Sequence, residues 1–320
     1  MSNWRPSSGA AAARRRAALI ERARAYFQEQ HVLAVDTPAL SRYAASDPNI
    51  ESFGLRGQAE TELFLNTSPE FCMKRLLASG YPDIYSICRV FRAGELGKRH
   101  APEFTMVEWY RLDFDLESIV ADTVRFVAAC LDSPRLARNV ARYDYADAFR
   151  KFADIDIFTV TADQLAPLCN ADARLESQMG ADVHTWFDLI MSTIIAPHFA
   201  ADQLTVIQHY PAAQAALARL CPANDQVADR FELFYGDLEL ANGYVELRDA
   251  GEQQRRIEQD LAVRRSKGRP VNPPDEQLIA ALASGLPACA GVAAGIERLQ
   301  MAHDKTDDIK HVVTFSSGTS

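Results

Sequence analysis

A pair of strand-like segments separated by a long polar loop constrains the fold most strongly. Residues 84–92 (IYSICRVFR) and 104–112 (FTMVEWYRL) are rich in β-branched and aromatic residues and alternate polar with apolar side chains. This period of two predicts two paired antiparallel strands. The 11-residue connection between them is longer than ordinary hairpin loops and carries charges of both signs. Its length indicates a functional loop.

Helical and strand-like patterns continue along the rest of the 320-residue chain. Residues 14–30 have apolar side chains at helical spacing, and a short strand follows at 32–35, which Pro38 would end. The other expected elements are a helix starting near 68–70, a largely helical stretch at 116–200, strands at 204–210, 231–236 and 238–247, and helices at 250–266 and about 275–284. One α+β domain over residues 1–320, with a mainly antiparallel sheet flanked by helices, fits this order best.

Composition narrows the class of protein. Hydrophobic residues make up 48% and charged residues 24%, which is typical of a soluble globular protein. The net charge of -9 argues against non-specific attraction to nucleic acid. Six cysteines without CxxC pairs or metal-ligand spacing suggest neither a disulfide framework nor a zinc site. With no apolar run long enough to span a bilayer and no signal-peptide pattern, we expect a cytoplasmic protein.

The loop between the two predicted strands carries the first set of candidate binding residues. Arg92 stands at its mouth, where a guanidinium can hold a phosphate by two hydrogen bonds. His100 can reach further phosphate oxygens, and Phe104 offers an aromatic face on which a base can stack. A nucleotide site is one interpretation; the other is a solvated loop in which Arg92 pairs with Glu95 or Glu103.

Two further segments could contribute chemistry. Glu239 and Glu246 are seven residues apart in LELANGYVEL, so a regular strand would place them on opposite faces unless a bulge near 242–243 intervenes. Two converging carboxylates beside phosphates would suit Mg²⁺, although carboxylates on the surface of a strand are the commoner explanation. In AGVAAGIERL, residues 290–299, small residues allow close approach of a ligand and Arg298 could bind phosphate or stack on a ring; tight helix packing is the alternative.

In this order, these segments resemble motifs 1, 2 and 3 of the class II aminoacyl-tRNA synthetases, at about 14–40, 84–112 and 288–303. The details TSPE (67–70), HAPEFTMVEWY (100–110) and ELANGYVEL (239–247) resemble the lysyl-tRNA synthetase branch, and most closely its truncated paralogs, the elongation factor P beta-lysine ligases. The chain begins at the motif 1 helix, so no anticodon-binding domain is expected. Ala293 stands where the synthetases have glycine, which would reshape the amino-acid pocket.

The resemblance implies a role for each matching position. Arg92 would act catalytically by holding the α-phosphate, and Glu239 and Glu246 would hold Mg²⁺. The implied ATP-binding residues are Arg92, Ala93, Gly94, Glu95, His100, Phe104, Glu239, Leu240, Gly295 and Arg298. The implied amino-acid pocket consists of Ser68, Pro69, Glu70, Tyr110, Glu246 and Ala293. The implied reaction is ATP-dependent activation of beta-lysine or lysine and its transfer to elongation factor P, without tRNA, by a homodimer formed through motif 1.

The motif 2 sequence departs from the family pattern. The family reads FRNE where this chain reads FRAG, with Ala93 and Gly94, and Ala101 replaces an asparagine. We expect Glu95 to replace the missing side chain. Two other functions stay open on these residues: a tRNA ligase or general amino-acid activator, and a noncatalytic regulatory subunit that kept the fold.

Overall fold

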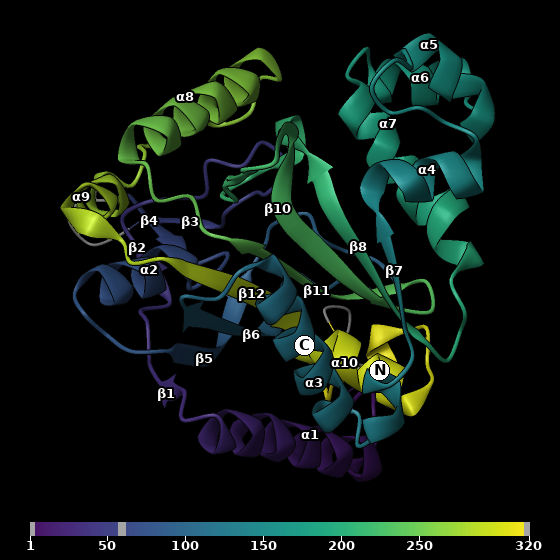
Figure 1. Cartoon of the computed structure of the whole chain (residues 1–320). Coiled ribbons are helices and arrows are strands. Elements are labelled where there is room, and N and C mark those ends of the chain that lie inside the picture. The colour runs from purple at the N-terminus through teal and green to yellow at the C-terminus, as the bar shows by residue number, and fades with distance from the viewer. Residues whose placement is uncertain (1–3, 57–61, 317–320) are drawn as a thin grey trace.

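The computed structural model describes residues 4–56 and 62–316. These residues form a nine-stranded sheet with helices around it (Figure 1). Along the sheet the strand order is β1-β5-β6-β12-β11-β10-β8-β7, and β9 pairs with β10. Pairing is antiparallel except at the two ends, where β1 runs parallel to β5 and β7 runs parallel to β8. A separate three-stranded sheet has the order β2-β4-β3.

The bounds of the elements follow the chain. The strands are β1 Leu33–Ala34, β2 Leu40–Ser41, β3 Gly54–Arg56, β4 Glu62–Leu65, β5 Ile84–Phe91, β6 Glu103–Leu112, β7 Val140–Asp144, β8 Leu204–Pro211, β9 Leu220–Cys221, β10 Asn224–Tyr235, β11 Leu238–Val245 and β12 Cys289–Gly295. The α-helices are α1 Ala10–Glu29, α2 Glu70–Ala78, α3 Leu116–Cys130, α4 Tyr145–Ala153, α5 Ala162–Leu165, α6 Ala173–Met179, α7 Val183–Ile190, α8 Ala250–Ser266, α9 Glu276–Gly285 and α10 Ile296–Asp304.

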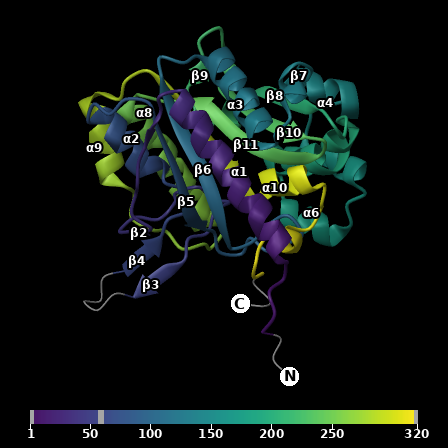
Figure 2. The same cartoon turned by 90° about the horizontal axis from the view of Figure 1, so that it is seen from below.

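One face of the large sheet is closed by α1, α3 and α10. Figure 2 shows α1 lying across this face beside α3. Val107 and Trp109 of β6 point into this layer, where Trp109 packs against Phe27 of α1 and Phe126 of α3. Alternation along β6 therefore sends the neighbouring residues, Met106, Glu108 and Tyr110, to the opposite face.

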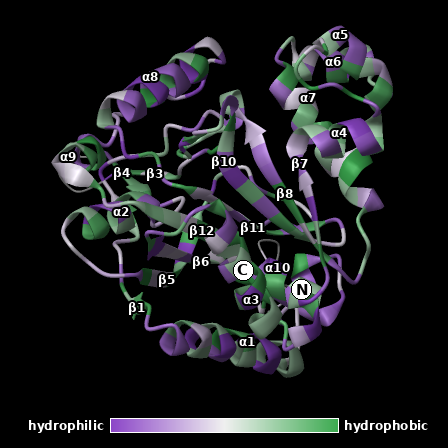
Figure 3. Ribbon diagram, in the orientation of Figure 1, coloured by the Kyte–Doolittle hydropathy of each residue, from purple (hydrophilic) through white to green (hydrophobic). Residues whose placement is uncertain are grey.

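Helices pack on the opposite face of the sheet at its two ends. At one end α2 and α9 pack on β5 and β12 around Met73, Leu77 and Leu278. At the other end α4 and α7 enclose their own apolar cluster, which includes Trp186 and Phe187. Helix α8 presents a largely polar surface in Figure 3. The middle of the sheet is thus left accessible for binding.

Most of the expected elements are confirmed. The predicted pair at 84–92 and 104–112 forms β5 and β6, with Ile84 opposite Tyr110 and Phe91 opposite Glu103. The helix predicted at 250–266 has the same bounds in α8. The expectation for 116–200 was incomplete, because the region also contains the strand β7, which pairs in parallel with β8. No helix within 4–56 and 62–316 is long and apolar enough to cross a membrane.

Candidate active site

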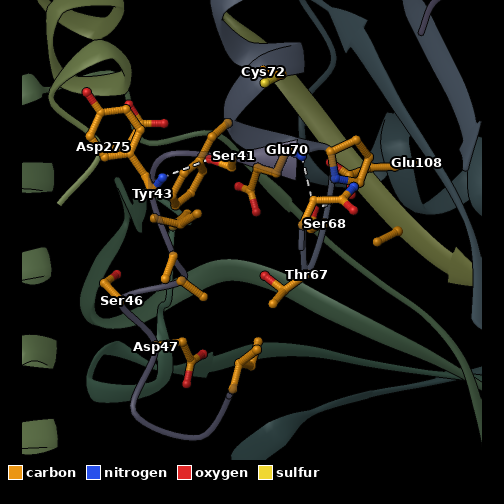
Figure 4. Close-up of a pocket in the computed structure, with 18 of the residues that line it drawn as sticks. Ser41, Tyr43, Ser46, Asp47, Thr67, Ser68, Glu70, Cys72, Glu108 and Asp275 are labelled. Carbon is orange, nitrogen blue, oxygen red and sulfur yellow. Dashed lines mark hydrogen bonds between the residues drawn. The ribbon is translucent and has the colours of Figure 1, made fainter. Parts of the chain in front are cut away.

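The uncovered face of β6, β11 and β12 forms the wall of a cavity of about 440 Å³. Glu108 and Tyr110 belong to β6 and Tyr244 belongs to β11. Glu246 directly follows the end of β11. The opposite wall comes from residues 41–47 and 67–72. Figure 4 shows Ser68, Glu70 and Glu108 gathered in one part of this cavity and Ser46 and Asp47 in another. The same alternation that builds the core on one face therefore lines a polar cavity on the other.

A buried ammonium group ties two carboxylates of this cavity together. Lys74 of α2 is 1% exposed, and its Nζ lies 2.7 Å from Glu70 Oε1 and 2.5 Å from Glu246 Oε2. Burial favours the neutral amine, but the two carboxylates outweigh it and raise the pKa of Lys74. The two carboxylates therefore favour the charged form of Lys74. The Tyr244 hydroxyl donates a further hydrogen bond of 2.6 Å to Glu70 Oε1.

A third carboxylate, Glu108, lies beside this pair and is only 3% exposed. Tyr110 donates to Glu108 Oε1 and Ser68 donates to Glu108 Oε2, both at 2.7 Å. Burial and the nearby Glu70 charge raise the pKa of Glu108 to about 7, and burial, opposed by Lys74, raises the pKa of Glu246 to about 8. This part of the cavity thus holds three carboxyl groups against one ammonium group, and a cationic ligand would favour the ionised form of these carboxyls.

A glycine makes room for two of these side chains. A Cβ on Gly291 of β12 would lie 2.5 Å from Tyr110 Cε1 and 2.6 Å from Glu246 Oε1, closer than nonbonded atoms approach. The backbone angle at Gly291 is not in the left-handed region, so this glycine serves the close approach. The small residues of the AGVAAG segment therefore have a role in the cavity as well as in packing.

A second cavity of about 280 Å³ lies beside the loop between β5 and β6. Arg298 of α10 donates to Glu239 Oε2 at 3.0 Å, and its Nη2 lies 2.7 Å from His100 Nε2. Because a guanidinium can only donate, His100 accepts through Nε2 and is neutral. Burial and the Arg298 charge lower the pKa of His100, in keeping with that state.

The two cavities adjoin at Arg92. The residues that line both are Arg92, Met106, Asn242 and Ala293. The Arg92 guanidinium lies over the Phe104 ring, 5.3 Å from its centre, and Nε donates to the Thr67 carbonyl at 3.3 Å. Arg92 is therefore held from both sides at the point where a group bound in one cavity would meet a group bound in the other.

The FRAG segment has a local explanation. Gly94 adopts φ +82°, a left-handed angle that a glutamate would occupy only with strain. The Ala93 amide donates to the Glu51 carbonyl at 2.8 Å, so the backbone here is fixed by a neighbouring segment. Glu95 Oε1 lies 3.5 Å from Arg92 Nη1, at the rim of the second cavity. The expected replacement by Glu95 stays a prediction, and its position beside Arg92 is compatible with it.

The predicted pairing of Glu239 with Glu246 around one cation does not fit the structure. A bulge does interrupt β11, because Leu233 of β10 opposes Ala241 while the next residue, Phe234, opposes Glu239. The extra residue brings Glu239 to the face of Asn242. Seven residues of strand nevertheless span roughly 20 Å. Glu239 lines the second cavity and Glu246 the first, so one ion cannot bind both.

A different carboxylate accompanies Glu239. Burial and the adjacent Glu239 charge raise the pKa of Glu232 of β10 to about 7, against the Arg230 guanidinium 2.7 Å away. The carboxylates of Glu232 and Glu239 repel each other, and a cation between them would relieve that repulsion. Carboxylate oxygens are the ligands that Mg²⁺ prefers. Glu232 was not among the predicted site residues, because in FELFYG it is one polar position of an ordinary strand.

Most of the remaining predicted residues line one cavity or the other. Ser68, Pro69, Glu70, Tyr110 and Glu246 line the first, while Glu95, His100, Phe104, Glu239, Leu240, Gly295 and Arg298 line the second. Ala293 lines both, whereas Ala93 and Gly94 belong to the loop and line neither. Besides Glu232, sequence reasoning missed Lys74, Glu108, Asn242 and Tyr244. Alternation was the available signal for two of them. In VEWY it puts Glu108 on the same face as Tyr110, and in NGYVE it puts Tyr244 on the same face as Glu246.

Comparison with known proteins identifies the class that this fold and these cavities define. Residues 3–319 match the family described as tRNA synthetases class II (D, K and N). The match covers nearly the whole chain, including the strands β6, β11 and β12 that form one wall of the first cavity.

Curated relatives narrow the class further. The chain is 36% identical over 321 residues to the elongation factor P--(R)-beta-lysine ligase of Avibacterium paragallinarum, covering 98% of this chain and 97% of the relative. It is 38% identical over 324 residues to the protein of the same name from Salmonella dublin, covering 98% of both. The chain therefore belongs to the class II tRNA synthetases and, within them, to the family of the elongation factor P--(R)-beta-lysine ligases.

Proposed function

We propose that this protein uses ATP to activate (R)-beta-lysine or lysine as an aminoacyl adenylate and transfers the aminoacyl group to a lysine side chain of elongation factor P. The observation that carries the proposal is the charge of the first cavity. Glu70, Glu108 and Glu246 bring three carboxyl groups together with one buried cation, Lys74. When all are ionised, the cluster has a net charge of -2, which the two ammonium groups of a diamino acid would balance.

The position of Arg92 supports the rest of the reaction. A diamino acid held by the carboxyl groups would extend its own carboxylate toward the junction of the cavities, where Arg92 lies. ATP in the second cavity would place its α-phosphate at the same guanidinium, with Phe104 and Arg298 on either side of the adenine. One carboxylate oxygen then attacks the α-phosphorus and pyrophosphate leaves. Arg92 would stabilise the charge that develops on the phosphorus oxygens.

Transfer completes the cycle. The ε-amine of the acceptor lysine attacks the carbonyl carbon of the adenylate, AMP leaves, and the nitrogen loses a proton as the amide forms. Membership of the class II family supports ATP as the activating substrate. The carboxylates of Glu232 and Glu239 would hold Mg²⁺, which when bound neutralises phosphate charge. A homodimer through residues 14–40 and independence from tRNA are parts of the same proposal.

The test is amino-acid-dependent exchange of pyrophosphate into ATP, run with (R)-beta-lysine and with L-lysine. We expect exchange with at least one of them, and mass spectrometry should then find one added aminoacyl group on purified elongation factor P. Arg92→Lys should lose at least 100-fold in exchange rate, because a point-like ammonium cannot hold phosphate by two hydrogen bonds. The matched variant Arg150→Lys, at an exposed side chain of α4 outside both cavities, should match the unaltered protein.

The alternative functions give other results. Exchange with neither isomer would favour a noncatalytic regulatory subunit. Exchange followed by charging of bulk tRNA, with no product on elongation factor P, would favour a tRNA ligase or general activator.

A further inference from the structure

Three side chains from three neighbouring strands meet outside the active site. They are His209 of β8, Cys221 of β9 and Asp229 of β10, and one ring nitrogen, the sulfur and one carboxylate oxygen all lie within 4.8 Å of one another. Asp229 is buried and the other two are half-buried. Ligand atoms around a tetrahedral Zn²⁺ lie about 3.4 Å apart, given metal bonds of about 2.1 Å. Side-chain adjustments of about an ångström would therefore bring these three onto one ion.

The groups around the cluster orient its members. Nδ1 of His209 lies 2.9 Å from Asp144 Oδ1, which leaves Nε2 as the ligand atom. The Arg219 Nε donates to Asp229 Oδ2 at 2.7 Å, which leaves the second oxygen of that carboxylate for a metal. A carboxylate that accepts a hydrogen bond from a histidine is the usual support of that histidine in metal sites, because it fixes the tautomer and the ring orientation.

The backbone is irregular at the same place. Tyr210 of β8 pairs with Ala228 and Gln208 with Phe231, so two residues of β10, Asp229 and Arg230, oppose His209 alone. His209 itself adopts φ +56°, a strained angle for a residue with a side chain. A bulge that re-aims a side chain is typical of binding sites. Here it sets His209 directly against Asp229.

We propose that His209, Cys221 and Asp229 form a binding site for a divalent ion of the zinc type, with water as the fourth ligand. The mixed set of imidazole, thiolate and carboxylate suits Zn²⁺ better than the oxygen-seeking Mg²⁺. Binding releases the Cys221 proton to solvent and creates a sulfur–metal bond.

The ion would fix one wall of the active site. Cys221 ends the segment 212–221, in which Ala216 and Leu217 line the first cavity. The same segment pairs with the chain around Glu246: Ala218 forms a bridge with Glu246, and the Arg219 amide donates to the Val245 carbonyl at 2.9 Å. Anchoring Cys221 to β8 and β10 would therefore restrain the backbone beside the amino-acid carboxylates.

Titration of Co²⁺ into the full chain, free of affinity tags and stripped of metal, tests the site. We expect one equivalent per chain, the visible bands of four-coordinate Co²⁺ and a near-ultraviolet sulfur-to-cobalt band, all displaced by Zn²⁺. Cys221→Ser should abolish the sulfur band, whereas Cys169→Ser, at another half-buried free thiol, should keep it. His209→Asn, which tolerates the left-handed angle, and Asp229→Asn, which can still accept from Arg219, should each weaken binding at least 10-fold.

Two results would overturn the site: the unaltered protein gives no sulfur band, or the band survives in Cys221→Ser. If Cys221→Ser fails to fold, judged by circular dichroism, the two asparagine variants decide, because unchanged affinity in both excludes His209 and Asp229 as ligands. Hydrogen exchange tests the restraint on the wall. At a Zn²⁺ concentration that just saturates the unaltered protein, exchange in 212–221 should slow more in the unaltered protein than in Asp229→Asn. Equal rates with and without Zn²⁺ in the unaltered protein would refute the restraint.

Discussion

Replacing Gly291 by alanine should separate amino-acid binding from ATP binding. The new Cβ would lie 2.5 Å from Tyr110 Cε1 and 2.6 Å from Glu246 Oε1. Because carbon atoms rest at about 3.5 Å or more, the Tyr110 ring must retreat by about 1 Å. That ring is 2% exposed and its hydroxyl donates to Glu108 at 2.7 Å, so the retreat disturbs a buried hydrogen bond as well as the packing.

The expected magnitudes follow from these contacts. Overpacking should lower the free energy of unfolding by about 1–3 kcal/mol. A displaced Tyr110 and Glu246 should raise the KM for the amino acid by about 10- to 100-fold, which is about 1.4–2.7 kcal/mol of binding. The KM for ATP should change by less than about 2-fold, since the second cavity does not include Gly291. Pyrophosphate exchange with one substrate varied at a time measures both constants.

Gly295→Ala on the same strand is the matched control. Its Cβ would meet only Arg298 atoms, at 3.8 Å or more, so the amino-acid KM should stay unchanged. Any effect of this variant should fall on ATP, because Gly295 lines the second cavity. An unaltered amino-acid KM in Gly291→Ala, or a parallel rise in both constants, would refute the assignment of the two cavities.

Three further predictions rest on single side chains. Glu95→Ala should raise the KM for ATP several-fold by removing the carboxylate beside Arg92, and an unchanged KM would defeat the idea that Glu95 replaces the family's glutamate. Glu232→Gln should raise the Mg²⁺ concentration that gives half-maximal exchange by about 10-fold; an identical Mg²⁺ dependence would remove Glu232 from the metal site. Glu246 has a folded-state pKa of about 8, raised above its unfolded value, so its stabilising contribution is complete below about pH 4.5 and is lost as the pH rises through about 8. The free energy of unfolding, from urea titrations at pH 5.5 and 8.5, should therefore fall more in the unaltered protein than in Glu246→Gln, and equal decreases would contradict the raised pKa.

Helices and strands were predicted well where the pattern of polar and apolar residues along the element is regular. The helix α8, predicted at about 250–266 from its charged pattern, begins where Asp249 accepts a hydrogen bond from the Glu252 amide. The strand β7 was missed because VARYD is short and pairs in parallel at an edge, where alternation is weak and only tertiary contact with β8 makes it a strand.

The sequence indicated several residues that lie in the site, but not which other side chains contact them. The family resemblance brought Tyr110 and Glu246 into one predicted pocket. Lys74, by contrast, has the pattern of any lysine on an amphipathic helix, and only the fold reveals that it is buried. Glu232 and Glu239 come together through the bulge in β11, and no spacing rule locates a bulge. Likewise, Cys221 reaches His209 only through strand pairing, which explains why cysteine spacing gave no metal signal.

Alternate residues of the strand β6 have different roles, because one set packs in the core and the other lines a cavity. Val107 and Trp109 pack against the layer of α1 and α3, while Met106, Glu108 and Tyr110 line the first cavity. Inserting or deleting one residue inside β6 would exchange the two sets and ruin both the core and the chemistry at once. In the adjoining loop, the residues around Leu96 and Gly97 are not bound by this alternation between core and cavity. Differences in length among related enzymes should therefore occur in that part of the loop and not within the strand.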